Sequence, residues 1–221
     1  MSWFKKTSYP EFWVAYSEHF KTKQKTDIDS IRFVVFDTET TGLNANQDRI
    51  LSIGTIGVFQ NIIKISDGFE CYLKQEFFKA ETVKIHGLLK AGTNIKLDEK
   101  TAVIQFLEYI KNAVLVAHNA SFDVTMINKA LKRLELPKLK NTVLDTKDIF
   151  NKTELDKTTK TNFSLDELSK RFNIPQHDRH TASGDAFITA LLFVKLVSNL
   201  KKEKDITLND LKSPSKRIGL L

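Results

Sequence analysis

Residues 33–43 read Phe33-Val34-Val35-Phe36-Asp37-Thr38-Glu39-Thr40-Thr41-Gly42-Leu43, an unbroken apolar run followed by two acids one residue apart. The apolar run is typical of a strand that is covered on both faces. Because side chains alternate along a strand, Asp37 and Glu39 are expected on one face at its end. Neighbouring carboxylates are costly away from water unless a cation lies between them. The stretch indicates either a solvated strand end, the usual outcome for a lone pair, or a site for a hard cation such as Mg²⁺ or Mn²⁺.

Two further acids favour the metal site. Asp123 follows the apolar segment 114–117 and shares a predicted helical face with apolar residues, which turns it toward the protein interior. Asp185 repeats this pattern near the start of another predicted helix, within a run of small residues that allows close approach to a neighbouring strand. Taken alone, Asp123 would be interpreted as a first-turn residue favoured by the helix dipole. Taken together, they predict four carboxylates around one site.

Three motifs carry a family resemblance. Residues 36–43 resemble the first exonuclease motif of the DnaQ-like 3′–5′ exonucleases of the DEDDh type. His118-Asn119-Ala120-Ser121-Phe122-Asp123 resembles the second motif, and His180-Thr181-Ala182-Ser183-Gly184-Asp185-Ala186 resembles the third. This family includes proofreading subunits of bacterial replicative polymerases, and the resemblance covers about residues 31–200.

The resemblance implies a role for each site residue. Asp37 would bridge two metal ions, Glu39 and Asp185 would hold the ion that carries the attacking water, and Asp123 would support the second ion. His180 would be the general base, and its neighbour His177 lacks the family's spacing to Asp185. A pair of ions can activate the water and stabilise both the transition state and the leaving oxygen. The implied cofactor is therefore Mg²⁺ or Mn²⁺, as two ions.

Three positions resemble substrate-binding residues of the family. Thr40 and Leu43 resemble residues that line the pocket for the terminal nucleotide, where Leu43 would contact the end base. Both could equally be structural. His86, in His86-Gly87-Leu88, resembles a residue beside the 3′-terminal nucleotide. Asp145 resembles a family strand end without a metal-binding role.

Composition agrees with an enzyme that acts on a polyanion. The chain has 221 residues, a formal charge of +7 and 41% hydrophobic residues, which is enough for a full core. A single cysteine, Cys71, excludes an internal disulfide framework and favours a cytoplasmic setting. The N-terminus lacks the apolar core of a signal peptide, and the longest apolar stretch, 187–197, contains Lys195 and is too short to span a bilayer. No membrane partner is expected.

Basic residues surround the acidic motifs. Between the second and third motifs they could follow a phosphate backbone, although solvated surface charges are the common alternative: Lys132, Arg133, Lys138, Lys140, Lys152, Lys157, Lys160, Lys170, Arg171 and Arg179.

The element pattern predicts an α/β fold. Strands are expected near 31–37, 50–59, 62–73, 113–117 and 142–146, with a hairpin turn at Gln60-Asn61. Helices are expected near 98–111, at 164–172 and at 182–200, and another is expected to follow the strand at 113–117 and to end at about 134. Family resemblance makes this a ribonuclease H-like fold, with a mixed five-stranded sheet in the order 3-2-1-4-5 flanked by helices.

Three regions are expected along the chain: a helical extension at 1–30, the exonuclease domain at 31–200 and a charged tail at 201–221. A helix with a capping box is expected from Ser8, and its aromatic residues Trp13, Tyr16 and Phe20 would pack on the core or dock a partner. The tail is expected to fray or to bind a partner.

The sequence therefore predicts a metal-dependent 3′–5′ exonuclease that releases nucleoside 5′-monophosphates from a free 3′ end. DNA is favoured over RNA, and a polymerase or another replication or repair protein is a possible partner. The alternatives are an exoribonuclease and a nucleic-acid-binding module without catalysis. The silent module predicts a missing acid or histidine, whereas all five residues are present.

Overall fold

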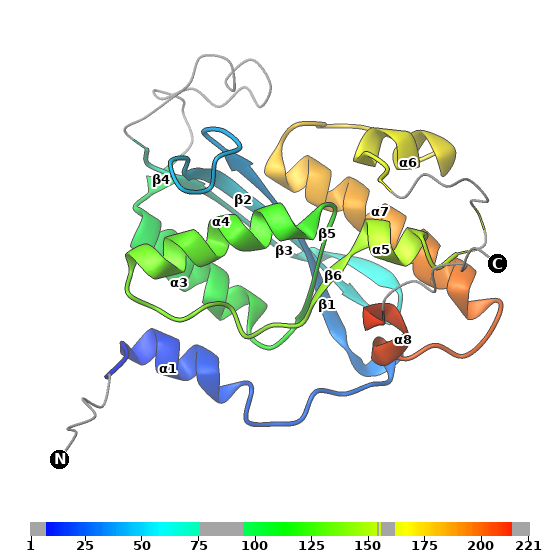
Figure 1. Cartoon of the computed structure of the whole chain (residues 1–221), viewed down its shortest axis with the longest axis horizontal. Helices are drawn as coiled ribbons and strands as arrows, with labels where there is room; N and C mark the ends of the chain where they lie inside the picture. The colour runs from blue at the N-terminus through cyan, green and yellow to red at the C-terminus, as the bar shows by residue number, and fades with distance from the viewer. Residues whose placement is uncertain (1–7, 76–94, 154, 156–161, 214–221) are drawn as a thin grey trace, which may run out of the picture.

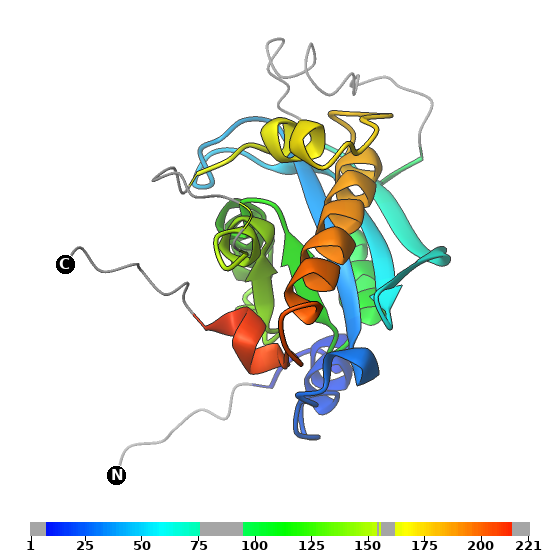
Figure 2. The same cartoon turned by 90° about the vertical axis from the view of Figure 1, so that its right-hand side faces the viewer.

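A mixed β-sheet with helices on both faces forms the centre of the computed structural model (Figures 1 and 2). The structure describes residues 8–75, 95–153, 155 and 162–213. The predicted α/β class is confirmed.

The sheet has six strands in the described part of the chain, in the order β4-β3-β2-β1-β5-β6. The three antiparallel-paired strands are β1 (Arg32–Thr40), β2 (Ile50–Phe59) and β3 (Ile62–Leu73). The parallel additions are β4 (Lys96–Leu97) beside β3, β5 (Val114–Ala117) beside β1, and β6 (Val143–Asp145) beside β5.

The expected count of five strands is wrong by one. Strand β4 has only two residues and lies at the edge of the sheet, so it leaves no periodic signal in the sequence. The order of the other five strands is the predicted one. The hairpin between β2 and β3 also turns where it was expected, with Gln60 and Asn61 both at positive φ, 53° and 59°, as a two-residue turn of this kind requires.

Strand β1 contributes side chains to the hydrophobic cores on both faces of the sheet. Phe33 and Val35 belong to one buried cluster, and Val34 and Phe36 belong to the other. This alternation explains why the strand reads as a continuous apolar run.

The helices divide between the two faces. Helices α3 (Glu99–Ile110) and α4 (Ala120–Arg133) cover one face, and α7 (Ala182–Lys201) crosses the other (Figure 2). Shorter helices α5 (Thr146–Phe150), α6 (Leu165–Arg171) and α8 (Leu208–Lys212) lie on the side of α7.

Helix α1 (Glu11–Glu18) packs its aromatic residues on the core of the α3 face. Trp13 and Tyr16 are buried, and the Tyr16 hydroxyl donates to Asn141 Oδ1 over 2.6 Å. The expected capping box at Ser8 is wrong: the helix is preceded by Pro10, and no side chain caps its first turn. A proline start suits a helix without that cap, since proline has no N–H to satisfy.

The segment after α7 also contacts the core. Ile206, Leu208 and Leu211 are buried in the cluster on the α7 face, and the Leu208 N–H donates to Thr26 O over 2.8 Å. The described parts of both extensions thus touch the domain, and the boundaries near residues 30 and 200 stay a proposal.

Helix α7 is longer than the apolar stretch seen in the sequence. By length and composition it is the one described helix that could cross a membrane, but most of it is buried inside the protein. Its position across the sheet explains its apolar character (Figure 1).

Candidate active site

Three carboxylates meet at the end of the central strand. Asp37 and Glu39 project from β1, and Asp185 projects from the first turn of α7. Each residue offers an oxygen atom that lies within 4.8 Å of those of the other two. The spacing of residues 37 and 39 predicted that these two carboxylates lie side by side. The position of Asp185 near a helix start predicted that it reaches them.

A glycine allows α7 to come this close. Gly54 on β2 lies opposite Asp37, and a Cβ atom there would be 2.2 Å from the backbone of Ala182 and Ser183. Gly184 is equally confined, because its Cβ would be 2.0 Å from Asp178 O. The expectation that small residues bring this helix against a strand is confirmed.

Asp123 is buried beside the cluster, 4% exposed, as its helical spacing predicted. Its Oδ1 accepts hydrogen bonds from the Thr38 N–H over 3.0 Å and the Thr38 hydroxyl over 2.6 Å. It is not part of the group of three oxygens, but its charge acts on Asp37. The four acids therefore gather at one end of β1.

The crowded carboxylates bind protons more tightly than usual. Burial raises the pKa of Glu39 to about 8, and the charges of Asp185 and Asp123 add to the shift. Burial raises the pKa of Asp123 to about 7 against its hydrogen bonds to Thr38. The pKa of Asp37 is well above its ordinary value through burial and then through Asp123, Asp185 and Glu39. These acids are thus destabilised as anions unless positive charge is added.

The donor set fits a hard divalent cation. It offers only carboxylate oxygens, with no cysteine or histidine nitrogen within the group of three, which is the ligand chemistry that Mg²⁺ and Mn²⁺ prefer. Asp37, Glu39 and Asp185 could hold one ion, and Asp123 lies outside this group of three.

His180 lies beside Asp185, two residues before the start of α7. Its side chain is exposed, its φ is 66°, and its N–H donates to Asp185 Oδ1 over 3.3 Å. A positive φ is uncommon for a residue with a side chain. His177 is also exposed, three residues earlier. The backbone contact links His180 to Asp185.

The expected substrate-binding residues have different environments. The Thr40 side chain is buried and donates to Gly42 O over 2.8 Å, whereas Leu43 is 86% exposed just beyond β1. An exposed leucine at this place is free to contact a ligand. His86 lies outside the described residues.

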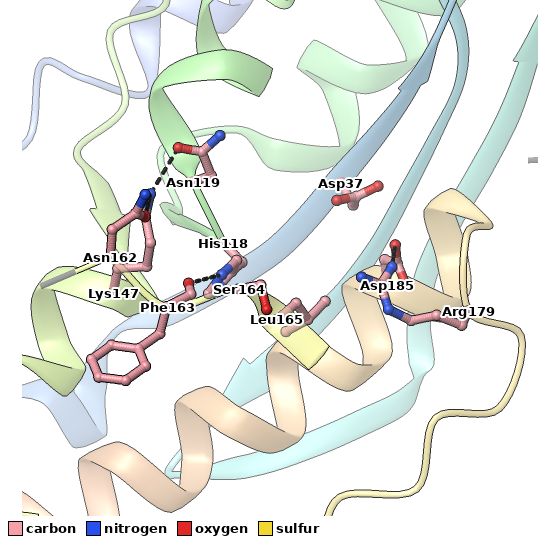
Figure 3. Close-up of a pocket in the computed structure, with 10 residues that line it drawn as sticks. All are labelled: Asp37, His118, Asn119, Lys147, Asn162, Phe163, Ser164, Leu165, Arg179 and Asp185. Atoms are coloured by element: carbon pink, nitrogen blue, oxygen red, sulfur yellow. Dashed lines mark hydrogen bonds and ion pairs between the residues drawn. The ribbon is translucent and has the colours of Figure 1, made fainter. Parts of the chain in front are cut away.

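An open cleft of about 340 Å³ leads from Asp37 and Asp185 (Figure 3). Its far wall is held by His118, whose Nε2 donates to Phe163 O over 2.9 Å while Nδ1 accepts from the Thr146 hydroxyl over 2.8 Å. Burial lowers the pKa of His118, which favours the neutral form. His118 therefore supports the wall of the cleft.

Hydrogen bonds with Asp145 and Lys147 position the motif around residue 119. Asp145 accepts from the Asn119 and Ala120 N–H groups over 3.2 and 2.8 Å, at the start of α4. Lys147 donates to Asn119 Oδ1 over 2.8 Å and to Asn162 Oδ1 over 3.3 Å, on the wall of the cleft. The sequence did not identify Lys147 as a residue of the site; only its place after a strand end could have indicated it.

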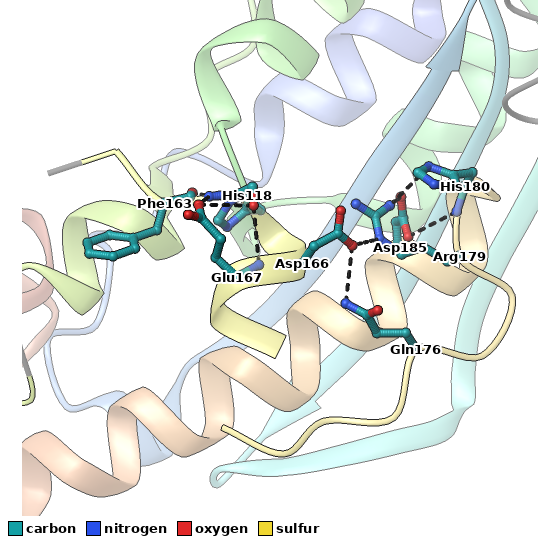
Figure 4. A network of polar contacts seen from close by, with 9 residues as sticks. His118, Phe163, Asp166, Glu167, Gln176, Arg179, His180 and Asp185 are labelled. Atoms are coloured by element: carbon teal, nitrogen blue, oxygen red, sulfur yellow. Dashed lines mark hydrogen bonds and ion pairs between the residues drawn. The ribbon is translucent and has the colours of Figure 1, made fainter. Parts of the chain in front are cut away.

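Arg179 makes a contact that the sequence did not predict. The sequence left open whether this residue follows a phosphate backbone or is a solvated surface charge. Its guanidinium lies in the site and donates to Asp185 Oδ2 (Figure 4). Arg133, from the same set, forms an ion pair with Glu99 over 2.6 Å. Both arginines are therefore engaged by carboxylates.

Comparison with known proteins shows the family to which this chain belongs. A family model described as RNase_T, Exonuclease, matches residues 34–193. The chain belongs to this exonuclease family.

The particular relatives are polymerases. The chain is 36% identical over 171 residues to a DNA polymerase III PolC-type of Caldanaerobacter subterraneus subsp. tengcongensis, covering 77% of this chain and 12% of that protein. It is 34% identical over 182 residues to the PolC-type polymerase of Bacillus subtilis, covering 80% and 12%. The chain thus spans about one eighth of the length of these relatives.

Solved structures share the fold. E. coli Exonuclease I in complex with a dT13 oligonucleotide matches with a TM-score of 0.66 at 15% identity, over 79% of this chain and 42% of that one. Exonuclease X in complex with 5′ overhanging duplex DNA matches with a TM-score of 0.57 at 23% identity, over 76% and 91%. The ribonuclease H-like, DnaQ-like fold expected from the motifs is confirmed.

Proposed function

We propose that this chain is a metal-dependent 3′–5′ exonuclease that releases nucleoside 5′-monophosphates. The observation that carries the proposal is the meeting of Asp37, Glu39 and Asp185 within 4.8 Å, with Asp123 buried beside them. Carboxylates with raised pKa values require added positive charge to be ionised together near pH 7. A phosphodiesterase site built on divalent cations meets this requirement.

Each residue has a role in this function. Asp37, Glu39 and Asp185 would hold one divalent ion, and Asp123 with Asp37 would support a second. When bound, the pair of ions supplies charge for the attacking water, the phosphoryl group and the leaving oxygen. His180, whose side chain is exposed and whose backbone N–H donates to Asp185, would accept the proton of the water. Asp123 is oriented by Thr38, which fixes the carboxylate beside Asp37.

The substrate we propose is the 3′ end of a nucleic acid, with DNA favoured over RNA. The cleft beside the acids is lined by Lys147 and Arg179, which suits a phosphodiester backbone. Exonuclease I and Exonuclease X bind DNA in the solved structures that share this fold. Leu43, exposed beside the site, would contact the terminal base, with Thr40 and His86 as further candidate contacts.

The relatives suggest the biological setting. Because the matched proteins are DNA polymerases, we propose that the chain works in replication or repair in the cytoplasm, and that a polymerase is its partner. The aromatic residues of α1 are largely packed on the core, so they do not by themselves identify a docking surface.

Matched 5′-labelled DNA and RNA oligonucleotides, incubated with Mg²⁺ or Mn²⁺, test this function. A labelled ladder that shortens from the 3′ end is expected, faster on DNA. Immediate release of the labelled 5′ nucleotide, or cutting of closed circles, would refute the polarity. Faster degradation of RNA would favour the alternative, a 3′–5′ exoribonuclease. No cleavage of either strand with binding retained would favour a silent nucleic-acid-binding module.

A further inference from the structure

Arg179 joins two carboxylates that come from different helices. Its Nε donates to Asp166 Oδ1 on α6 over 2.8 Å, and its Nη1 donates to Asp185 Oδ2 on α7 (Figure 4). Nη1 also lies 3.4 Å from Nδ1 of His180. The side chain is only 20% exposed. One guanidinium thus touches a candidate metal ligand and the candidate base.

This guanidinium acts on the whole acid cluster. Its charge lowers the pKa values of Asp37, Glu39 and Asp185 against the larger effect of burial. Lys147, another cation on the cleft wall, is bonded to amide oxygens of Asn119 and Asn162. The acids therefore have a counter-charge from Arg179, whereas the charge of Lys147 is held at neutral groups.

A divalent ion and Arg179 compete for the same carboxylate. Asp185 Oδ2 accepts from Arg179, and Oδ1 accepts from the His180 N–H. An ion that binds Asp185 would lie next to the guanidinium of Arg179. Because two neighbouring cations repel, the ion must displace or weaken the contact between Arg179 and Asp185. The released group lies in the wall of the substrate cleft, and its planar fork suits a phosphate.

We propose that Arg179 is an internal counter-cation of the acid cluster, which pairs with Asp185 when no divalent ion is bound and with a substrate phosphate when one is. This inference rests on the proposed exonuclease function. It assigns Arg179 two partners in turn, and it makes the binding of metal and of phosphate depend on each other.

The variant Arg179→Gln tests this role by metal binding. Mn²⁺ is titrated calorimetrically into the full chain, with and without a deoxynucleoside 5′-monophosphate. Loss of a competing cation should tighten the binding of Mn²⁺ alone, on the order of tenfold. The monophosphate should then bind more weakly to the Mn²⁺-loaded variant than to the wild type. The metal-free variant should also melt at a lower temperature, because the acids lose their counter-charge.

Arg133→Gln is the matched control. Arg133 pairs through Nε and Nη2 with Glu99, between α4 and α3, and is 27% exposed. This change removes a comparable ion pair away from the acids. It should lower the melting temperature and leave the affinity for Mn²⁺ unchanged.

Asp166→Asn provides a second variant, in which the affinity for Mn²⁺ should change in the opposite direction. It removes the other anchor of Arg179 at a residue that is 44% exposed, so the fold should tolerate it. The guanidinium is then left to Asp185, and Mn²⁺ should bind a few-fold more weakly.

The two variants separate the possible outcomes. Unchanged or weaker Mn²⁺ binding in Arg179→Gln would refute the proposal that Arg179 is a counter-cation. Arg179 would then only hold α6 and α7 together. If Arg179→Gln does not fold, tighter or unchanged binding in Asp166→Asn would overturn the proposal instead. Absence of Mn²⁺ binding to the wild type would refute the proposed metal site itself, and the inference with it.

Discussion

Replacing Glu39 with glutamine should make the metal-free protein more stable at alkaline pH. The change keeps the size of the side chain and removes a charge that the folded protein accommodates poorly. Its pKa rises from an ordinary 4.5 to about 8, mainly through burial and then through Asp185. The folded state therefore holds a proton that the unfolded state has released, and stability falls as the pH rises between these two values.

The size of the effect follows from that window. At about 1.4 kcal/mol for each pH unit, the two pKa values set an upper limit of about 5 kcal/mol. Glu39 keeps partial contact with solvent and shares its proton affinity with nearby acids, so we expect about 2 kcal/mol. The contribution is fully present below pH 4.5 and lost by about pH 8.

Urea unfolding in excess chelator, at pH 4.5 and pH 8.5, measures this difference. Glu39→Gln should match the wild type at the lower pH and exceed its free energy of unfolding by about 2 kcal/mol at the higher one. A variant that is less stable than the wild type at pH 8.5 would refute the reasoning.

Asp67→Asn is the control for the sign of this effect. The hydrogen bonds of Arg32 to Asp67, 2.7 and 2.8 Å long, lower the pKa of that carboxyl. Its contribution is therefore present above its ordinary pKa of 3.8 and is lost as the pH falls. Asp67→Asn should reduce stability at both pH values.

Three other predictions concern the base, the close helix contact and the metal. His180→Ala should keep the fold and lower the cleavage rate by a factor of about 10²–10⁴, while His177→Ala should lower it far less. The rates are compared on labelled DNA at saturating metal, and a greater loss in His177→Ala would show that His177 is the base. Gly54→Ala should cost about 1–3 kcal/mol and weaken Mn²⁺ binding, because the new Cβ would lie 2.2 Å from backbone at the start of α7; Gly68→Ala is its control, with a nearest neighbour at 3.5 Å. Chelation should stop cleavage without unfolding, and Mg²⁺ or Mn²⁺ should restore activity and raise the melting temperature; Asp37→Ala should abolish both effects, and full activity in excess chelator would contradict the metal site.

Local periodicity made much of the site readable in advance. Asp37 and Glu39 follow a buried strand with one residue between them, so a period of two places them on one face. Asp123 and Asp185 stand in the first turns of helices whose apolar faces are regular. The hairpin at Gln60-Asn61 and the order of five strands are likewise consequences of short-range patterns and of family motifs.

Tertiary contacts decided the rest. Strand β4 forms because two residues meet the edge of β3, and the segment around Leu208 belongs to the core because it packs beside Thr26. Neither segment is long enough to show a period of its own.

Arg179 shows the limit of sequence reasoning most clearly. In the sequence it is one basic residue among many, six positions before Asp185. Its partners are Asp166 on α6 and Asp185 on α7, and both are within hydrogen-bonding distance only because these two helices lie on either side of Arg179 in the folded chain. Sequence determines which side chains an element presents and in what period. Which charge faces which depends on distances between elements, and these are set by packing of the whole fold.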